Sequence, residues 1–338
     1  MWTLAQEVLS PGAALQVLLA SPPVLFFFLG AFAALVKSNL YVPKPVTKLL
    51  SLYLLWAIGF KGGVEIARSG LTAEAVWAGA IGIGMACVVP VYVYFLVRRF
   101  VSGPNAAALA ATYGSISAVT FMAASAILDT RGIAYGGHMV AVMALMESPA
   151  IVIAVILLRL SGNSGEETGD GSAASRRGHG SWGRLLHEAF LNGPVLLLLG
   201  SLLIGCITAD RGYKLFKPLA GDLFNGVLVF FLLDLGILAA RRLHDLRKAG
   251  VILVLLGIAI PLVNAAAAFL LCRYAALPRG DTILLMTLCA SGSYIAVPAA
   301  ARLVLPRATP GLYVSMALGV TFPFNIAVGI PLYVLVTK

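Results

Sequence analysis

Charged residues are scarce in this chain, and their scarcity excludes a soluble enzyme. Only 11% of the 338 residues are Asp, Glu, Lys or Arg, whereas soluble domains carry about 25%. So few charges do not cover the water-facing surface of a chain this long, and 60% of the residues are hydrophobic. The composition therefore predicts a polytopic membrane protein whose largest contact is the lipid bilayer.

Signatures of catalysis, metal clusters and nucleic-acid binding are absent as well. The sequence holds no His-Glu-x-x-His, Gly-x-Ser-x-Gly or P-loop motif, which disfavours an intramembrane enzyme and a bound cofactor. The net charge is +10, but Lys and Arg lie at the ends of apolar blocks, as membrane anchors do, and form no basic–aromatic run for nucleic acid. No Cys-x-x-Cys motif occurs, so neither a disulfide framework nor a zinc site is indicated by the cysteines, Cys87, Cys206, Cys272 and Cys289.

Apolar blocks of bilayer-spanning length follow one another along the chain. A span needs about 20 mostly apolar residues, and that length gives ten candidates, roughly 15–36, 45–66, 73–97, 104–128, 135–159, 186–208, 218–240, 249–274, 281–304 and 310–336. The only long polar stretch is rich in Gly, Ser and charge and is typical of a linker. We therefore expect an all-α protein with a five-span repeat at 1–160, a cytoplasmic linker at 161–182 and a second repeat at 183–338.

The two halves share short motifs that keep their order, with offsets of 171 to 176 residues. Because five is odd, the second half enters the membrane from the opposite side, which predicts a 5+5 inverted repeat, an architecture of many secondary transporters. An old duplication kept only for stability is the alternative. The matched pairs are Pro23 and Pro194, Gly63 and Gly236, Pro90 and Pro261, Ser115 and Ser291, and Glu147 and Thr321.

The distribution of cations predicts the orientation. If the N-terminus lies outside, the cytoplasmic connections hold 15 of the 24 Lys and Arg residues and the external connections hold the other 9. Cytoplasmic loops carry the excess of Lys and Arg. We therefore expect a multi-pass protein of the plasma (inner) membrane with both termini outside.

The fourth and ninth spans contain Gly and Ser near their middles, which predicts broken helices. Non-helical backbone at membrane depth survives only where it lines a cavity or is buried in protein. Each break exposes the N–H groups of a half-helix, and two such ends facing each other make an anion site. Close helix packing at small residues is the alternative. The predicted anion-binding residues are Gly114, Ser115, Ser117, Ser291, Gly292 and Ser293.

Glu147 is the most conspicuous acid in an apolar context and predicts an ion pathway, because a charge near the bilayer centre is costly. A glutamate solvated by headgroups near a span end is the alternative. Its repeat equivalent is neutral Thr321, with Asn325 one turn further on. We predict a Na⁺ site at Thr120, Glu147, Thr321 and Asn325, with Thr120 the weaker candidate. Asp234 also lies at membrane depth, and its role stays open between an ion pair and a gate.

The order of these segments resembles the sodium-dependent bicarbonate transporter family, best known from cyanobacterial inorganic-carbon uptake. The chain differs from cyanobacterial members at Ser293-Tyr294, where they carry a Ser-rich run followed by Asp, and at Glu147-Ser148-Pro149, where they carry Asp-Ile-Pro. The resemblance extends from about Pro23 to the C-terminus apart from the linker. It is carried by Lys61-Gly62-Gly63-Val64-Glu65, Tyr113-Gly114-Ser115-Ile116-Ser117, Glu147-Ser148-Pro149-Ala150, Ala290-Ser291-Gly292-Ser293-Tyr294-Ile295-Ala296-Val297-Pro298 and Gly319-Val320-Thr321-Phe322-Pro323.

The resemblance implies a gate domain of spans 1, 2, 6 and 7 and a core domain of spans 3–5 and 8–10. It implies bicarbonate and Na⁺ bound near the breaks, a homotrimer, and a PII-like regulatory protein on the cytoplasmic face. We therefore expect Na⁺-coupled uptake of bicarbonate, with Na⁺ as coupling ion and no cofactor. The alternative is a Na⁺- or H⁺-coupled symporter of another small organic anion, to which Tyr294 would contribute an aromatic wall or a hydroxyl. A channel is disfavoured by the inverted repeat with broken helices.

Overall fold

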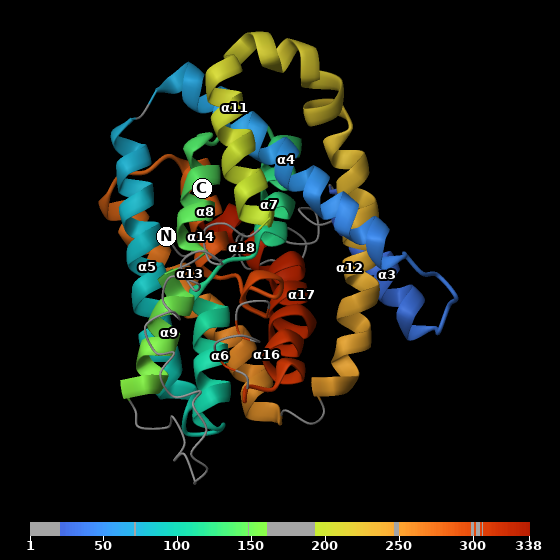
Figure 1. Cartoon of the computed structure of the whole chain (residues 1–338), viewed down its shortest axis with the longest axis vertical. Coiled ribbons are helices and arrows are strands. Elements are labelled where there is room, and N and C mark those ends of the chain that lie inside the picture. Colours follow the sequence, from blue (N-terminus) through green and yellow to red (C-terminus); the bar gives the residue numbers. More distant parts are fainter. Residues whose placement is uncertain are drawn as a thin grey trace, which may run out of the picture.

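The computed structural model describes residues 21–338 except 71, 148, 161–192, 247–249, 299–300, 302–304 and 306. Every regular element in these residues is a helix (Figure 1). The predicted linker at 161–182 lies outside the described residues, as do the first residues of the predicted first and sixth spans.

The helices differ widely in length. In chain order they are α3 (Pro22–Leu35), α4 (Lys44–Ser69), α5 (Ala73–Val97), α6 (Gly103–Gly114), α7 (Ala118–Thr130), α8 (His138–Met146), α9 (Pro149–Leu160), α11 (Gly193–Phe216), η1 (Lys217–Asp222), α12 (Phe224–Leu246), α13 (Val251–Tyr274), α14 (Arg279–Cys289), α16 (Pro310–Met316), η2 (Ala317–Thr321), α17 (Phe322–Phe324), η3 (Asn325–Gly329) and α18 (Ile330–Val336).

Seven helical segments of the described chain are long and apolar enough to cross a bilayer. One of them, Gly193–Arg242, has 50 residues and contains the described part of the sixth predicted span and the whole of the seventh, because the π-helix η1 joins α11 to α12. The helix α3 is apolar but has only 14 residues, and the predicted span that contains it begins outside the described residues. The protein is a multi-pass helical membrane protein.

Local sequence signals fix where several helices begin and end. Thr72 caps α5, because its hydroxyl oxygen accepts a hydrogen bond from the Ala75 amide at 3.4 Å. Gly70 ends α4 with a φ of +72°, a conformation that glycine adopts without steric cost. Proline, whose missing N–H costs nothing in the first turn, occupies the first or second position of α3, α4, α6, η1 and α16.

Two long helix pairs cross backbone to backbone at glycines. The helix α3 packs along α12 and α4 packs along α11 (Figure 1). A Cβ atom at Gly30 of α3 would meet the carbonyl oxygen of Leu233, and one at Gly236 of α12 would meet that of Phe27. Only glycine permits so close an approach of two main chains.

The second pair, α4 and α11, repeats this arrangement. A Cβ atom at Gly63 would meet the carbonyl oxygen of Leu202, and one at Gly205 would meet that of Phe60. Both crossings therefore place a glycine of each helix against the main chain of its partner.

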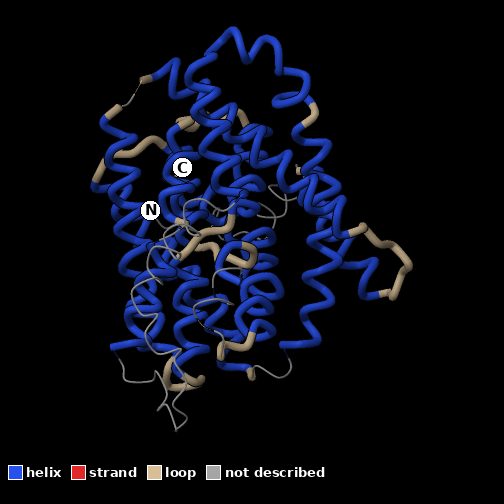
Figure 2. The backbone as a smooth tube through the Cα atoms, viewed as in Figure 1, coloured by secondary structure: helices blue, strands red, loops and turns tan. Residues whose placement is uncertain are grey.

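The remaining helices pack together beside these pairs. The helix α5 contacts α6, α8 and α9, while α13 contacts α14 and η2. Figure 2 shows loop segments in the middle of this bundle, between helices that lie above and below them. These interruptions position the site.

Candidate anion and cation site

Both interruptions predicted from Gly and Ser are present. The helix α6 ends at Gly114 and α7 begins at Ala118, and the residues between them are not helical. The helix α14 ends at Cys289, and residues 291–293 have no regular structure. The fourth and ninth predicted spans are therefore broken near their middles.

The two interruptions are hydrogen-bonded to each other. The Ser117 amide donates to the Ser291 hydroxyl oxygen at 2.8 Å. The Ser293 amide donates to the Thr112 carbonyl oxygen at 2.9 Å. Ser291 in turn donates its hydroxyl hydrogen to the Leu288 carbonyl at 2.8 Å. These bonds satisfy backbone groups that the breaks would otherwise leave unpaired at membrane depth.

In each interruption a serine hydroxyl accepts a hydrogen bond from the main chain that follows it. The Ser117 hydroxyl oxygen accepts a hydrogen bond from the Thr120 amide at 3.2 Å. The Ser293 hydroxyl oxygen accepts one from the Val297 amide at 3.3 Å. Because an accepting hydroxyl keeps its hydrogen, both serines remain able to donate to a ligand.

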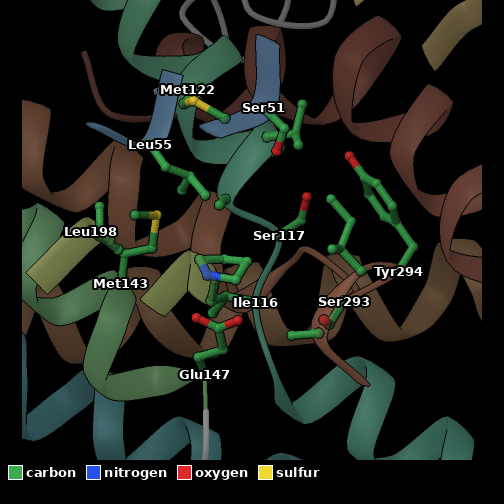
Figure 3. Close-up of a pocket in the computed structure, with 15 residues that line it drawn as sticks. Ser51, Leu55, Ile116, Ser117, Met122, Met143, Glu147, Leu198, Ser293 and Tyr294 are labelled. Atoms are coloured by element: carbon green, nitrogen blue, oxygen red, sulfur yellow. The ribbon is translucent and has the colours of Figure 1, made fainter. Parts of the chain in front are cut away.

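A central pocket of about 50 Å³ lies between the start of α7 and the second interruption. Ser117 and Ala118 line it from one interruption and Ser293 and Tyr294 from the other (Figure 3). This volume exceeds the roughly 10–15 Å³ that one water molecule needs. Since helix N-termini carry partial positive charge, the pocket is suited to a small anion.

Glu147 lines the same pocket, where Figure 3 shows its carboxylate among the labelled side chains. Glu147 directly follows α8, which ends at Met146. The Ser115 hydroxyl donates to the Glu147 carbonyl oxygen at 2.9 Å. A residue predicted for the cation thus lies with Ser117 and Ser293, which were predicted for the anion.

Thr321 and Asn325 lie outside the central pocket and are fully buried. Thr321 donates its hydroxyl hydrogen to the Gly257 carbonyl at 2.7 Å and lies 2.9 Å from the Tyr113 hydroxyl. The two residues flank α17, with Thr321 ending η2 and Asn325 beginning η3. Single π-turns inside helices are frequent at functional sites.

Asn325 connects the last helical segments to the second interruption. Its side-chain amide donates to the Ala290 carbonyl at 2.7 Å, and its side-chain oxygen accepts from the Tyr333 hydroxyl at 3.2 Å. Of the four residues predicted for the cation, only Glu147 lines the pocket, since Thr120 also lies behind it. The central pocket therefore contains only one of these four side chains.

The two predicted glycines also lie outside the pocket lining. A Cβ atom at Gly114 would meet the ring of Pro90 and lie 2.9 Å from the Ala150 Cβ. At Gly292 a Cβ atom would lie 3.3 Å from the Ala317 Cβ. Gly114 therefore permits a close approach of α6 to α5, which is a packing role.

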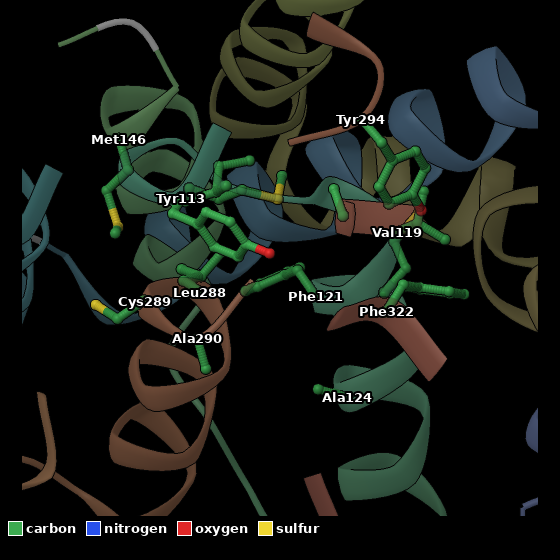
Figure 4. Packing of buried hydrophobic residues seen from close by; sticks show 14 of the residues in the cluster. Tyr113, Val119, Phe121, Ala124, Met146, Leu288, Cys289, Ala290, Tyr294 and Phe322 are labelled. Atoms are coloured by element: carbon green, nitrogen blue, oxygen red, sulfur yellow. The ribbon is translucent and has the colours of Figure 1, made fainter. Parts of the chain in front are cut away.

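Tyr294 forms the aromatic wall of the pocket. Its hydroxyl is buried and has no hydrogen-bond partner among the described residues. The Tyr294 ring packs edge to face against the Phe322 ring, with 5.6 Å between the ring centroids (Figure 4). A buried phenol without a partner is able to donate to a ligand in the pocket.

The described residues hold no group of three His, Cys, Asp or Glu side chains able to bind a metal ion. A hard cation such as Na⁺ prefers oxygen ligands, which here are the Glu147 carboxylate, hydroxyls and the carbonyls freed at the interruptions. Asp234 lies apart, accepting a hydrogen bond from the Thr47 hydroxyl at 2.7 Å.

Sequence reasoning missed several contacts between ionisable side chains. His138 Nε2 lies 3.2 Å from Asp281 Oδ2, buried between the first turns of α8 and α14. Lys61 Nζ lies 4.0 Å from Asp129 Oδ2. Each pair joins residues far apart in the chain, so no local signal indicates it.

The sequence model of the Na⁺-dependent bicarbonate transporter superfamily matches residues 22–338. The chain belongs to this superfamily. Among curated proteins, none matches the chain at a significant level. The family resemblance expected from the motifs is confirmed, and membership in the Na⁺-dependent bicarbonate transporter superfamily indicates a transporter and not an enzyme.

Proposed function

We propose that the protein is a Na⁺-coupled symporter that takes up bicarbonate and holds it in the central pocket. The observation that carries this proposal is the convergence of both interruptions, one of them opening α7, on one small cavity that also contains a carboxylate. A helix N-terminus attracts anions without a Lys or Arg side chain. Family membership supports bicarbonate and Na⁺ as the solutes.

In this proposal the anion lies against the hydroxyls of Ser117 and Ser293. Ser115 and Ser291 act through the backbone that they hold, and Gly114 and Gly292 through close packing. The Glu147 carboxylate repels a bare anion in the same pocket. A Na⁺ ion between the carboxylate and the anion removes that repulsion, so each solute raises the affinity for the other.

The proposed Na⁺ site depends on Glu147 directly. Thr120, Thr321 and Asn325 contribute by fixing the backbone at the first interruption and at the two π-turns. Binding at one carboxylate with neutral oxygens suits a monovalent ion. Na⁺ enters and leaves with each cycle, and no resident cofactor is proposed.

We propose that α3, α4, α11 and α12 form a gate domain and that the other helices form a core, in a ten-span 5+5 inverted repeat. Three features support this division: the long-helix pairs, the matching glycine crossings, and a proline inside both α5 and α13. Alternating exposure of a site between two inverted halves is the usual mechanism of such transporters.

The assembly and orientation are proposals of the same kind. We place both termini outside the plasma (inner) membrane and the 161–182 segment in the cytoplasm, in line with the cation distribution. A homotrimer and a PII-like regulator on the cytoplasmic face follow from the family resemblance alone.

Uptake of labelled bicarbonate into proteoliposomes tests the proposal. With an inward Na⁺ gradient we expect uptake well above that with an equal K⁺ gradient at the same pH. Equal uptake under both gradients would reject Na⁺ coupling. Uptake driven by a pH gradient alone would favour H⁺.

Substitutions then test the site. We expect the Ser117→Ala/Ser293→Ala variant to raise the KM for bicarbonate about tenfold or more, since two donors to an anion are lost. Ser201→Ala is the matched control, because among the described residues that buried hydroxyl bonds only to its own helix, at the Leu197 carbonyl. Glu147→Gln, which keeps the shape and removes the charge, should abolish Na⁺ stimulation. An unchanged KM in the double variant contradicts the half-helix site.

The second candidate is a symporter of a small organic anion, and the unpartnered Tyr294 hydroxyl favours it. Formate, acetate and lactate should then compete with labelled bicarbonate. Tyr294→Phe should weaken the competition by these carboxylates more than it weakens bicarbonate uptake. Lack of competition leaves bicarbonate as the cargo.

A further inference from the structure

A second cavity, of about 220 Å³, lies between α4, α7 and the loop that joins α7 to α8. It is more polar than the central pocket, because Lys61, Glu65, Asp129 and Tyr135 all line it. None of these residues belongs to the site described above.

The polar cavity and the central pocket lie along the same three helices. On each of α4, α7 and α8, a residue that lines the central pocket lies one turn from a residue that lines the polar cavity. Both cavities therefore border one path between α4 and the helices packed against it. The successive pairs are Leu55 and Ile58 on α4, Met122 and Ser125 on α7, and Met143 and Val140 on α8.

The charge of Lys61 is only loosely engaged. Its ammonium lies 4.0 Å from Asp129 Oδ2, with the two side chains 29% and 39% exposed. It also lies 5.4 Å from the centre of the Phe224 ring. Exposed ion pairs at this separation contribute little to stability, so an incoming anion displaces Asp129 at small cost.

The second carboxylate of the cavity is already paired. Glu65 forms an ion pair with Arg68, which also contacts Asp210 at 2.6 Å. The Tyr135 hydroxyl is a neutral donor, because a phenol is protonated at neutral pH. The cavity offers an ammonium and a hydroxyl to an anion, with Asp129 as the competing carboxylate.

We propose that the polar cavity is a docking site for a small oxyanion, held by Lys61 before it passes to the central pocket. The naming of that oxyanion as bicarbonate rests on the proposed function. Leu55, Met122 and Met143 line the central pocket on the three helices that border both cavities, so an anion passing between the cavities would pass these side chains. When no anion is present, Asp129 is the ion-pair partner of the Lys61 ammonium.

Thiol labelling tests the docking site without requiring transport. Ala134, exposed and lining the cavity, is replaced by cysteine in a protein whose half-buried Cys87 and Cys206 are replaced by alanine. The modification rates of A134C are compared for an anionic and a cationic methanethiosulfonate of similar size. The background protein without A134C corrects for residual labelling.

We expect Lys61→Gln to lower the ratio of anionic to cationic rate about three- to tenfold, because a nearby positive charge is lost. Asp129→Asn should raise the ratio, and Lys61→Arg should leave it within about twofold. At constant ionic strength, bicarbonate should slow the modification of A134C by the anionic reagent in the protein that keeps Lys61, and should not slow it in the Lys61→Gln variant.

Three results would overturn the proposal. The first is a labelling ratio that does not respond to Lys61→Gln. The second is a shift of the ratio in the same direction for Lys61→Gln and Asp129→Asn, as expected if the Lys61–Asp129 pair has only a structural role. The third is protection of A134C by Na⁺ in place of bicarbonate, which would make the cavity a cation site. Because labelling does not require transport, its result can be interpreted even if Na⁺-coupled uptake in proteoliposomes fails. Ser117→Ala/Ser293→Ala, which affects only the central pocket, should leave the labelling ratio unchanged.

Discussion

The paired long helices and the interrupted helices are held together by opposite means. At the crossings of α3 with α12 and of α4 with α11, glycines bring main chain against main chain, and no side chain fits between them. At the interruptions, serine hydroxyls hold the main chains, as between Ser291 and Ser117. The first region depends on the absence of side chains and the second on their presence.

This difference explains where ligands are able to bind. A backbone crossing leaves no room for a ligand, so it fixes the distance between two helices. The interruptions leave hydroxyls and half-helix starts facing a cavity. The site lies where the second kind of packing meets the first, since Leu55 of α4 and Leu198 of α11 close the pocket.

The largest effect is expected where a side chain enters a backbone crossing. In Gly63→Ala the new Cβ would meet the Leu202 carbonyl oxygen and lie 2.8 Å from the Cys206 amide nitrogen. We expect the free energy of unfolding to fall by about 2–3 kcal/mol, measured by titrating the detergent-solubilised protein with dodecyl sulfate. Gly79→Ala on α5 is the control, because nothing lies within 4 Å of its Cβ position. Equal stability of the two variants would refute the crossing.

A smaller effect is expected where a hydroxyl is removed from the interruptions. Ser291→Ala leaves the buried Ser117 amide without its acceptor, which costs about 2 kcal/mol. Thr287→Val is the control, because the Thr287 hydroxyl bonds only to the Ile283 carbonyl of its own helix. The same titration should separate the two variants. A loss no greater for Ser291→Ala would mean that the hydroxyls do not hold the breaks together.

The smallest effect is expected behind the pocket. Tyr113→Phe removes the hydroxyl contact with Thr321, while Thr321 keeps its bond to the Gly257 carbonyl. We expect a loss of about 1 kcal/mol in the free energy of unfolding. The exposed Tyr41 provides a Tyr→Phe control that should match the unmodified protein. A loss larger than that of Ser291→Ala would mean that the contact behind the pocket stabilises the fold more than the bond between the interruptions.

Composition and local signals predicted the helical class and both interruptions. Gly and Ser around Ser117 and Ser291 weaken the helix at membrane depth, and the chain leaves the helical path there. A proline alone does not indicate such a break, since Pro90 lies inside α5. The apolar context of Glu147 indicated a functional residue, but no local signal indicated that it would share a pocket with Ser117 and Ser293.

The partners of each helix could not be predicted from the sequence. In water, an apolar stripe shows which face of a helix is buried, but a helix in lipid is apolar all round. The crossings at Gly30 and Gly63, and the meeting of Lys61 with Asp129, join segments far apart in the chain. The π-turns before Thr321 and after Asn325 also leave no clear signal, since they depend on how the last helix fits its neighbours.

The two hydrogen bonds that tie the interruptions together have a mechanical consequence. Each break lends a polar group to the other, from Ser291 to the Ser117 amide and from Thr112 to the Ser293 amide. Neither interrupted segment is able to slide or straighten by itself without leaving a backbone polar group unpaired at membrane depth. The two interruptions therefore move as one unit, and a motion of α6 and α7 also displaces α14.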